Sequence, residues 1–95
     1  MLKTKKFEVT DYLKTEKDIS EYLNVILEEN DYTYLPVALA DIARARKAMT
    51  AAAKAAGVTR TNLYQSLSTD GRPAFDTVAK VANSLGYKIT LVPVT

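Results

Sequence analysis

Apolar residues recur with helical spacing in the first third of the chain. Between Thr15 and Asn30 they fall three and four residues apart, which is the spacing of a helix with one apolar side. Thr15 and Asp18 resemble a capping box at the start of this helix, and Asn30 with Asp31 ends it. The apolar stripe consists of Ile19, Tyr22, Leu23, Ile26 and Leu27.

A second amphipathic pattern predicts another helix. Thr33 is expected to cap it, and Pro36 falls in its first turn, where a missing N–H does no harm. Asp41, Arg44 and Lys47 are expected on the outer side. The residues expected to face inward are Leu35, Ala38, Leu39, Ile42 and Ala45.

The stretch from Thr50 to Leu67 predicts two short helices joined by a tight turn. Thr50 is expected to cap a helix over residues 51–56, and Gly57 supplies the left-handed residue that ends it. Thr59 is expected to cap a second short helix, which spans residues 60–67. This order of helix, glycine turn and helix is typical of a helix-turn-helix unit.

The last third predicts one more helix and then a strand. Apolar residues with helical spacing run from Phe75 to Leu85, and Gly86 stops the pattern. The alternating, β-branched stretch from Tyr87 to Val94 reads as a strand, which needs a partner, most simply the same strand of a second copy. The residues expected in this dimer strand are Tyr87, Ile89, Leu91 and Val92. The chain is thus expected to be all-α, with five helices and a short C-terminal strand.

Composition removes many kinds of chemistry. The 95 residues contain no cysteine and no histidine, so disulfides, thiolate or imidazole catalysis and most transition-metal sites are excluded. No EF-hand-like loop is present. We therefore expect no cofactor, no metal and no enzymatic activity. Because no apolar run suggests a membrane span or a secretory signal, the protein is expected to be soluble and cytoplasmic.

Charge is divided unevenly along the chain. Residues 1–30 hold five lysines against seven acidic residues, whereas residues 31–95 hold eight basic residues against four aspartates. Between Arg44 and Arg72 there are six basic residues and one acidic residue. A basic middle suggests a polyanion as partner, and an acidic front suggests a basic one; ordinary surface charge is the alternative.

The helix over residues 60–67 has one polar side. Leu63 and Leu67 lie opposite this side and are expected to anchor the helix. Arginine can bond two guanine acceptors and glutamine can pair with adenine, so these groups suit a major groove. The predicted base contacts are Arg60, Thr61, Tyr64 and Gln65, and the predicted phosphate contacts are Thr59, Arg46, Lys47, Lys54 and Arg72. A merely solvated polar face is the alternative.

Three segments resemble the addiction-module antidote proteins, which are HigA-like antitoxins with an Xre-type, phage-repressor-like helix-turn-helix. Residues 38–46 (ALADIARAR) are similar to that family's "AL-DIARA" segment, and residues 59–78 are similar to its "sReSLYkaLSpdGnPtFdTv" stretch. Residues 11–13 and 19–23 resemble its N-terminal portion. The chain departs from the family's pattern at Ala51 and Ala52, at Ala74, which replaces a hydroxyl-bearing cap, and at Lys47, near where a glycine often precedes Met49.

The resemblance implies a five-helix, phage-repressor-like domain and a type II antitoxin. Such a protein would neutralise a small basic toxin of the RelE/ParE type and repress its own operon as a dimer bound to double-stranded operator DNA. The expected division is residues 1–30 for an N-terminal arm and helix that contact the toxin, 31–86 for the DNA-binding domain and 87–95 for the dimerisation strand. Charge complementarity alone assigns the toxin contacts, which are Phe7, Tyr12, Leu13, Glu16, Ile19, Tyr22, Leu23 and Ile26.

Several alternatives stay open at this point. The stripe from Ile19 to Leu27 is equally compatible with a toxin interface and with the core of the domain. The toxin's target, either ribosome-bound mRNA or gyrase, is not indicated. Two other functions are considered: a stand-alone Xre-type repressor without a toxin, and an all-α protein-interaction module with no role on DNA.

Overall fold

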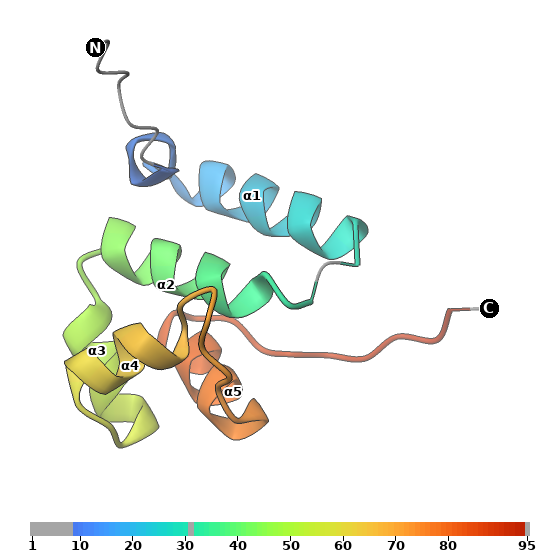
Figure 1. The fold of residues 1–95 in the computed structure, drawn as a ribbon. Helices are drawn as coiled ribbons and strands as arrows, with labels where there is room; N and C mark the ends of the chain where they lie inside the picture. Colours follow the sequence, from blue (N-terminus) through green and yellow to red (C-terminus); the bar gives the residue numbers. More distant parts are fainter. Residues whose placement is uncertain (1–8, 31, 95) are drawn as a thin grey trace, which may run out of the picture.

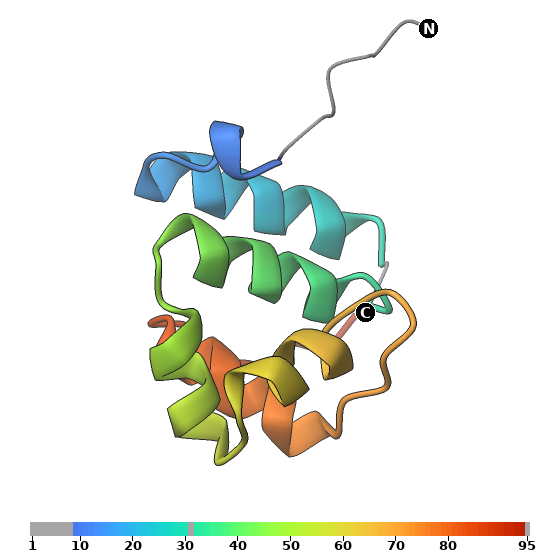
Figure 2. The same cartoon turned by 60° about the vertical axis from the view of Figure 1, so that its left-hand side comes forward.

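The fold is a small bundle of helices. The computed structural model describes residues 9–30 and 32–94, and within these ranges all regular structure is helical, which confirms the all-α expectation. A 3-10 helix, η1 (Val9–Tyr12), precedes five α-helices: α1 (Glu16–Glu28), α2 (Leu35–Ala45), α3 (Met49–Ala56), α4 (Arg60–Ser66) and α5 (Phe75–Ser84). Helices α1 and α2 lie side by side, and α3, α4 and α5 gather on the other side of α2 (Figure 1, Figure 2).

The start of α1 confirms the predicted capping box. The Thr15 hydroxyl accepts a hydrogen bond from the backbone N–H of Asp18 at 3.1 Å, and the Asp18 carboxylate accepts one from the N–H of Thr15 at 3.1 Å. Two of the N–H groups that a helix start leaves without an intrahelical partner are thereby satisfied.

The predicted caps of α2 and α3 are wrong by one or two residues. Tyr34 caps α2 without a side-chain bond, so Thr33 lies one residue too early. Helix α3 begins at Met49 after Ala48, which places Thr50 inside its first turn. The reason is the end of α2, where Lys47 adopts a left-handed φ of 55° and Ala48 bonds back to the Ala43 carbonyl. This is a Schellman closure, and it leaves no residue between the turn and α3.

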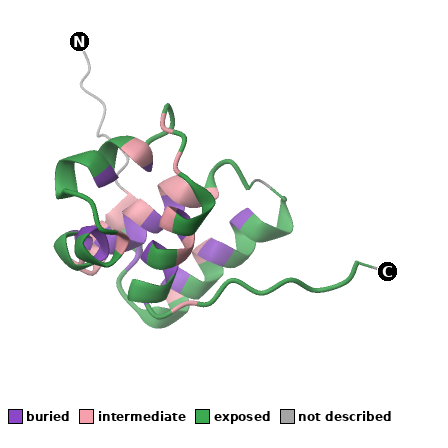
Figure 3. Ribbon diagram, turned by 90° about the horizontal axis from the view of Figure 1, so that it is seen from below, coloured by how far each residue is buried: buried purple, intermediate pink, exposed green. Residues whose placement is uncertain are grey.

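One hydrophobic core joins all five α-helices. Its most deeply buried large side chains are Ile42, Leu63, Leu67 and Val81, which come from α2, α4, the end of α4 and α5. The α1 stripe belongs to this core, because Ile19, Leu23 and Ile26 are 3%, 9% and 7% exposed. Buried positions accordingly line the inner sides of the helices (Figure 3). Of the two readings of this stripe, the core is correct for these three side chains.

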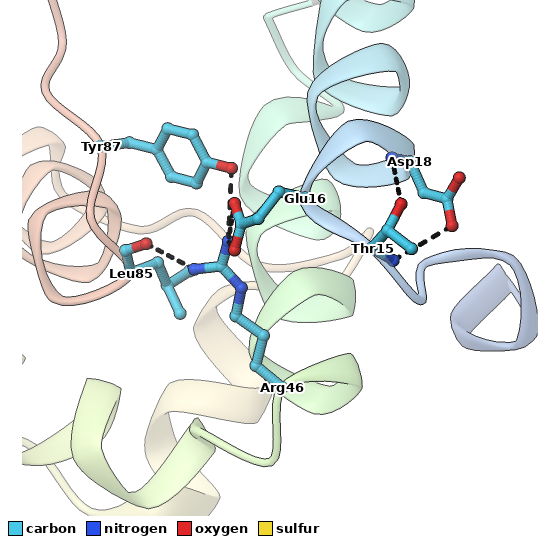
Figure 4. A network of polar contacts seen from close by, with 6 residues as sticks. All are labelled: Thr15, Glu16, Asp18, Arg46, Leu85 and Tyr87. Carbon is cyan, nitrogen blue, oxygen red and sulfur yellow. Dashed lines mark hydrogen bonds and ion pairs between the residues drawn. The ribbon is translucent and has the colours of Figure 1, made fainter.

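Arg46 fastens three parts of the fold together. Its guanidinium donates to the Leu85 carbonyl at 2.6 Å and to both carboxylate oxygens of Glu16 at 2.9 Å, and it lies 5.6 Å from the Tyr87 ring centroid (Figure 4). The start of α1, the end of α2 and the end of α5 therefore meet at one side chain. The sequence predicts a DNA phosphate contact for Arg46; in the fold its guanidinium is engaged by these intramolecular partners.

The predicted C-terminal strand is absent from the described chain. Beyond Tyr87, residues 88–94 run away from the bundle as an irregular extended segment (Figure 1). Leu91, Val92 and Val94 are 91%, 76% and 98% exposed. A strand is defined by ladder hydrogen bonds, and a single chain offers this segment no neighbouring strand with which to form them. Over the same described residues, no helix has the length and apolar character needed to cross a membrane.

Arg46→Met is expected to lower the free energy of unfolding by about 1–3 kcal/mol. The substitution keeps much of the side chain's length but removes the charged donors, which leaves the Leu85 carbonyl without this partner. Urea unfolding measures the change. Arg72→Met is the matched control, because Arg72 is exposed, and it should change the free energy by no more than about 0.5 kcal/mol. Equal losses in the two variants would contradict the role given to Arg46.

Candidate nucleic-acid interface

Two leucines hold α4 on the bundle. Leu63 and Leu67 are both 0% exposed, and α4 packs against α3. The helix has seven residues, which is too short for a helix to be stable without tertiary contacts. Its position is therefore fixed by burial of this one side, as the sequence predicts.

The turn between α3 and α4 has the predicted chemistry. Gly57 has a left-handed φ of 76°, and the N–H groups of Gly57 and Val58 bond to the carbonyls of Lys54 and Ala53. The Thr59 hydroxyl then accepts from the N–H of Asn62 at 3.1 Å and caps α4. These local bonds set the angle at which α4 leaves α3.

The opposite side of α4 faces solvent. Arg60, Thr61, Tyr64 and Gln65 are all exposed, as the prediction of base contacts requires. The guanidinium carbon of Arg60 lies 5.7 Å from the Tyr64 ring centroid, so the two side chains stack one turn apart. An arginine, a hydroxyl, a phenol and an amide thus stand together on one exposed helix side.

The other predicted phosphate contacts differ in how they are placed. Lys47, Lys54 and Arg72 are exposed, whereas the Thr59 hydroxyl serves as the helix cap. Arg72 follows Gly71, where an added Cβ would collide with the Gln65 and Ser66 carbonyls. Glycine is therefore required for the close return of the chain past α4.

A shallow notch lies beside the start of α4. Arg44 and Lys47 at the end of α2 line it together with Thr50 of α3 and Arg60 of α4; Met49 and Tyr64 complete the lining. Three of these six residues are cationic and none is acidic. Sequence patterns alone do not bring Arg44 and Thr50 to this place, because they place Arg44 on the outer side of its helix and Thr50 as the cap of the next helix.

A second hollow lies along α1 and is different in character. It is lined by Val9, Tyr12, Leu13, Asp18, Glu21, Tyr22, Val25 and Tyr34. Tyr12 and Val25 are 63% and 55% exposed, and the two charged residues in this lining are both acidic. The surface is therefore apolar with an acidic edge.

The predicted toxin contacts fall into three groups. Ile19, Leu23 and Ile26 are buried in the core and do not line the hollow, whereas Leu13, also buried, forms part of its lining. Tyr12 and Tyr22 line the hollow along α1, and Glu16 has an exposed carboxylate that pairs with Arg46. Phe7 lies outside the described residues.

Asp41 is buried, contrary to the expectation that it faces outward. It is 7% exposed and accepts hydrogen bonds from Tyr22 at 2.7 Å and from Arg44 at 2.8 Å. The spacing of three residues to Arg44 indicates an ion pair within one helix. Tyr22 lies 19 residues earlier on α1, and no local pattern connects it with Asp41.

Comparison with known sequences identifies the family. Residues 3–93 match the profile of a family described as a probable addiction module antidote protein. The chain belongs to this family. A relative from Haemophilus influenzae, which carries no functional description, is 46% identical over 84 residues, covering 88% of this chain and 86% of that protein. No solved structure matches.

The match to the antidote family spans the residues of both surfaces. The matched residues include α4, the notch beside it and the hollow along α1. The antidote role predicted from the resemblance is supported by this match, whereas the more specific HigA-like and Xre-type assignments are not tested by it.

Lys47 of this antidote-family protein has a left-handed backbone, and substitutions there test whether the turn between α2 and α3 is strained. A side chain at a φ of 55° costs about 1 kcal/mol that glycine avoids. The free energy of unfolding of Lys47→Gly should therefore exceed that of Lys47→Ala by about 1 kcal/mol, as measured by urea unfolding. Both variants lose the same ammonium group, so the comparison isolates the backbone. Equal stability would show that the turn carries no such strain.

Proposed function

We propose that this protein is the antitoxin of a type II toxin–antitoxin module. In this proposal it neutralises a small basic toxin of the RelE/ParE type by direct binding. It also represses its own operon by sequence-specific binding to double-stranded DNA. It acts in the cytoplasm as a homodimer, without enzymatic activity and without a cofactor. Membership of the antidote family supports the toxin-binding half.

The exposed polar side of α4 carries the DNA-binding half. Leu63 and Leu67 use the buried side for anchoring, so Arg60, Tyr64 and Gln65 are left outward in a row that suits a major groove. Lys47, Lys54 and Arg72 are exposed cations available to the flanking phosphates. In this proposal α4 is the recognition helix of an Xre-type helix-turn-helix.

The hollow along α1 is proposed as the toxin-binding surface. A basic toxin presents cations, and the lining of this hollow contributes Asp18 and Glu21 but no cation. Its exposed Tyr12 and Val25 add apolar area of the kind that interfaces bury. The proposed toxin-binding site is thereby narrowed from the acidic residues 1–30 to the hollow along α1.

The homodimer in this proposal involves the C-terminal segment. Ile89, Leu91 and Val92 expose apolar surface that pairing with a second copy would cover, and pairing would satisfy the extended backbone. Tyr87 is packed against Arg46 within its own chain, so pairing would begin after it. Two copies related by a two-fold axis would present two α4 helices to a palindromic operator.

Gln65→Ala and Arg60→Ala are each expected to weaken binding to the DNA immediately upstream of the gene by about 10- to 100-fold. Each substitution removes a side chain proposed to bond a base edge. Its effect should therefore be concentrated at one base position when single base pairs of the site are changed. Fluorescence anisotropy with labelled duplex measures the affinity, and circular dichroism checks that the fold is intact.

Two variants on α1 are the controls for this experiment. Asn24→Ala removes an exposed amide and Lys17→Ala removes an exposed cation, on a helix that lies on the far side of α2 from α4 (Figure 2). Both should bind DNA as the parent protein does. Normal binding by Gln65→Ala and Arg60→Ala would refute the recognition role of α4 and favour an interaction module without DNA binding.

Glu21→Lys is expected to weaken binding to the product of the adjacent reading frame by roughly tenfold or more. A lysine in the hollow along α1 places like charge against a basic toxin. Titration calorimetry measures the affinity, and a growth assay with both proteins co-expressed measures neutralisation. A full deletion of residues 1–30 is unsuitable, because it would remove core side chains of α1.

Glu28→Lys is the matched control for the toxin experiment. It makes the same charge reversal on the same helix, at an exposed position that does not line the hollow. It should neutralise as well as the parent protein. Equal behaviour of the two variants would place the toxin on another surface, and an adjacent gene without toxic product would favour a stand-alone repressor.

A further inference from the structure

A buried carboxylate lies between the two surface hollows. Asp41 is the one charged side chain classed as buried in residues 9–30 and 32–94. Its oxygens accept from the Tyr22 hydroxyl at 2.7 Å and from the Arg44 guanidinium at 2.8 Å. A buried charge is tolerated only with such partners, so the positions of the three side chains are mutually dependent.

Tyr22 is a permanent donor in this arrangement. Burial, and then the hydrogen bond to Asp41, raise the pKa of Tyr22 far above its ordinary value. The phenol therefore stays protonated and donates to the carboxylate at any physiological pH. The Tyr22 hydroxyl, on α1, thereby orients the Asp41 carboxylate, which accepts the hydrogen bond of Arg44 within α2.

Arg44 extends from this buried pair into the notch beside α4. Its side chain is 35% exposed, against 10% for that of Asp41, and it forms part of the lining of the notch. There it meets the lining formed by Lys47, Thr50 and Arg60. Asp41 balances the charge of Arg44, and Lys47 and Arg60 bring two further cations to the lining, so an anion placed in the notch would be attracted to it.

We propose that this notch binds one backbone phosphate of duplex DNA, with Arg44 as its fixed member. Lys47 and the Thr50 hydroxyl supply further donors from the adjacent turn and helix. A phosphate is favoured over a carboxylate ligand, because the lining offers donors from three helices or turns to a single compact anion. The inference rests on the proposed DNA-binding function and adds Arg44 and Thr50 to its surface.

Tyr22 is a positioning residue for this phosphate site. It does not line the notch, but through Asp41 it holds the Arg44 fork in one orientation. An arginine fixed in this way loses less side-chain freedom when it binds a phosphate than a mobile one does. The hydroxyl of Tyr22 should therefore affect DNA affinity only while Arg44 is present.

The test measures binding of a random-sequence 30-base-pair duplex over a series of salt concentrations, because a phosphate contact is independent of sequence. Arg44→Gln should lower the affinity roughly tenfold and make the slope of log affinity against log salt shallower by about one. Arg44→Lys keeps the charge and should keep the slope while losing less affinity. Lys17→Gln, on α1, should change neither quantity.

A double-mutant cycle tests the positioning role. Tyr22→Phe should lower the affinity about two- to fivefold in the parent protein and have no effect in the Arg44→Gln background. A merely structural effect of Tyr22 would persist in both backgrounds. Thermal melts of every variant establish that the comparison is made on folded protein.

The outcomes separate this inference from the proposed function. If the parent protein binds neither the random duplex nor the upstream DNA, the proposed DNA-binding function fails. If the parent binds DNA but Arg44→Gln leaves affinity and salt slope unchanged, the phosphate site is refuted while α4 recognition stands. If Arg44→Gln has its expected effect but Tyr22→Phe acts equally in both backgrounds, the site stands and the positioning role is refuted.

Discussion

Complete burial of Leu63 and Leu67 is the interaction on which the candidate DNA surface depends. Seven residues cannot maintain a helix alone, and each fully buried leucine contributes about 1.5–3 kcal/mol toward holding α4 on the bundle. The Thr59 cap contributes about 1 kcal/mol more. Because the buried side of the helix anchors it, the side chains on the exposed side are not needed for packing. Arginine, threonine, tyrosine and glutamine can stand there without cost to the fold, and this division of roles makes a short helix suitable for recognition.

Features that depend on neighbours in the sequence could be predicted. The helices follow from apolar spacing, the capping box from Thr15 and Asp18, and the turn before α4 from Gly57 and Thr59. Features that depend on distant partners could not. Arg46 reads as one more cation in a basic stretch, but its partners Glu16 and Leu85 lie 30 and 39 residues away. The expected C-terminal strand is absent from the described residues for a related reason, since the partner strand that would form its ladder hydrogen bonds does not lie in the same segment.

Two adjacent cations illustrate why charge counts alone cannot define a binding surface. Arg46 and Lys47 follow one another at the end of α2, and both read as phosphate contacts. The Schellman closure of α2 turns the chain between them, so that Arg46 points to α1 and α5 while Lys47 lines the notch beside α4. The backbone conformation of a single residue thus assigns one cation to the fold and the other to the surface.

Asp41 cannot be understood from stability alone. Removing a charge from water is expensive, and a buried ion pair is often no more stabilising than apolar side chains of similar size. An apolar side chain at this position would need no hydrogen-bonding partners. What the carboxylate does, and an apolar side chain would not, is connect a hydroxyl on α1 to a guanidinium at the molecular surface. Its free-energy cost is accounted for if Arg44 must be held in one orientation, as a phosphate contact requires.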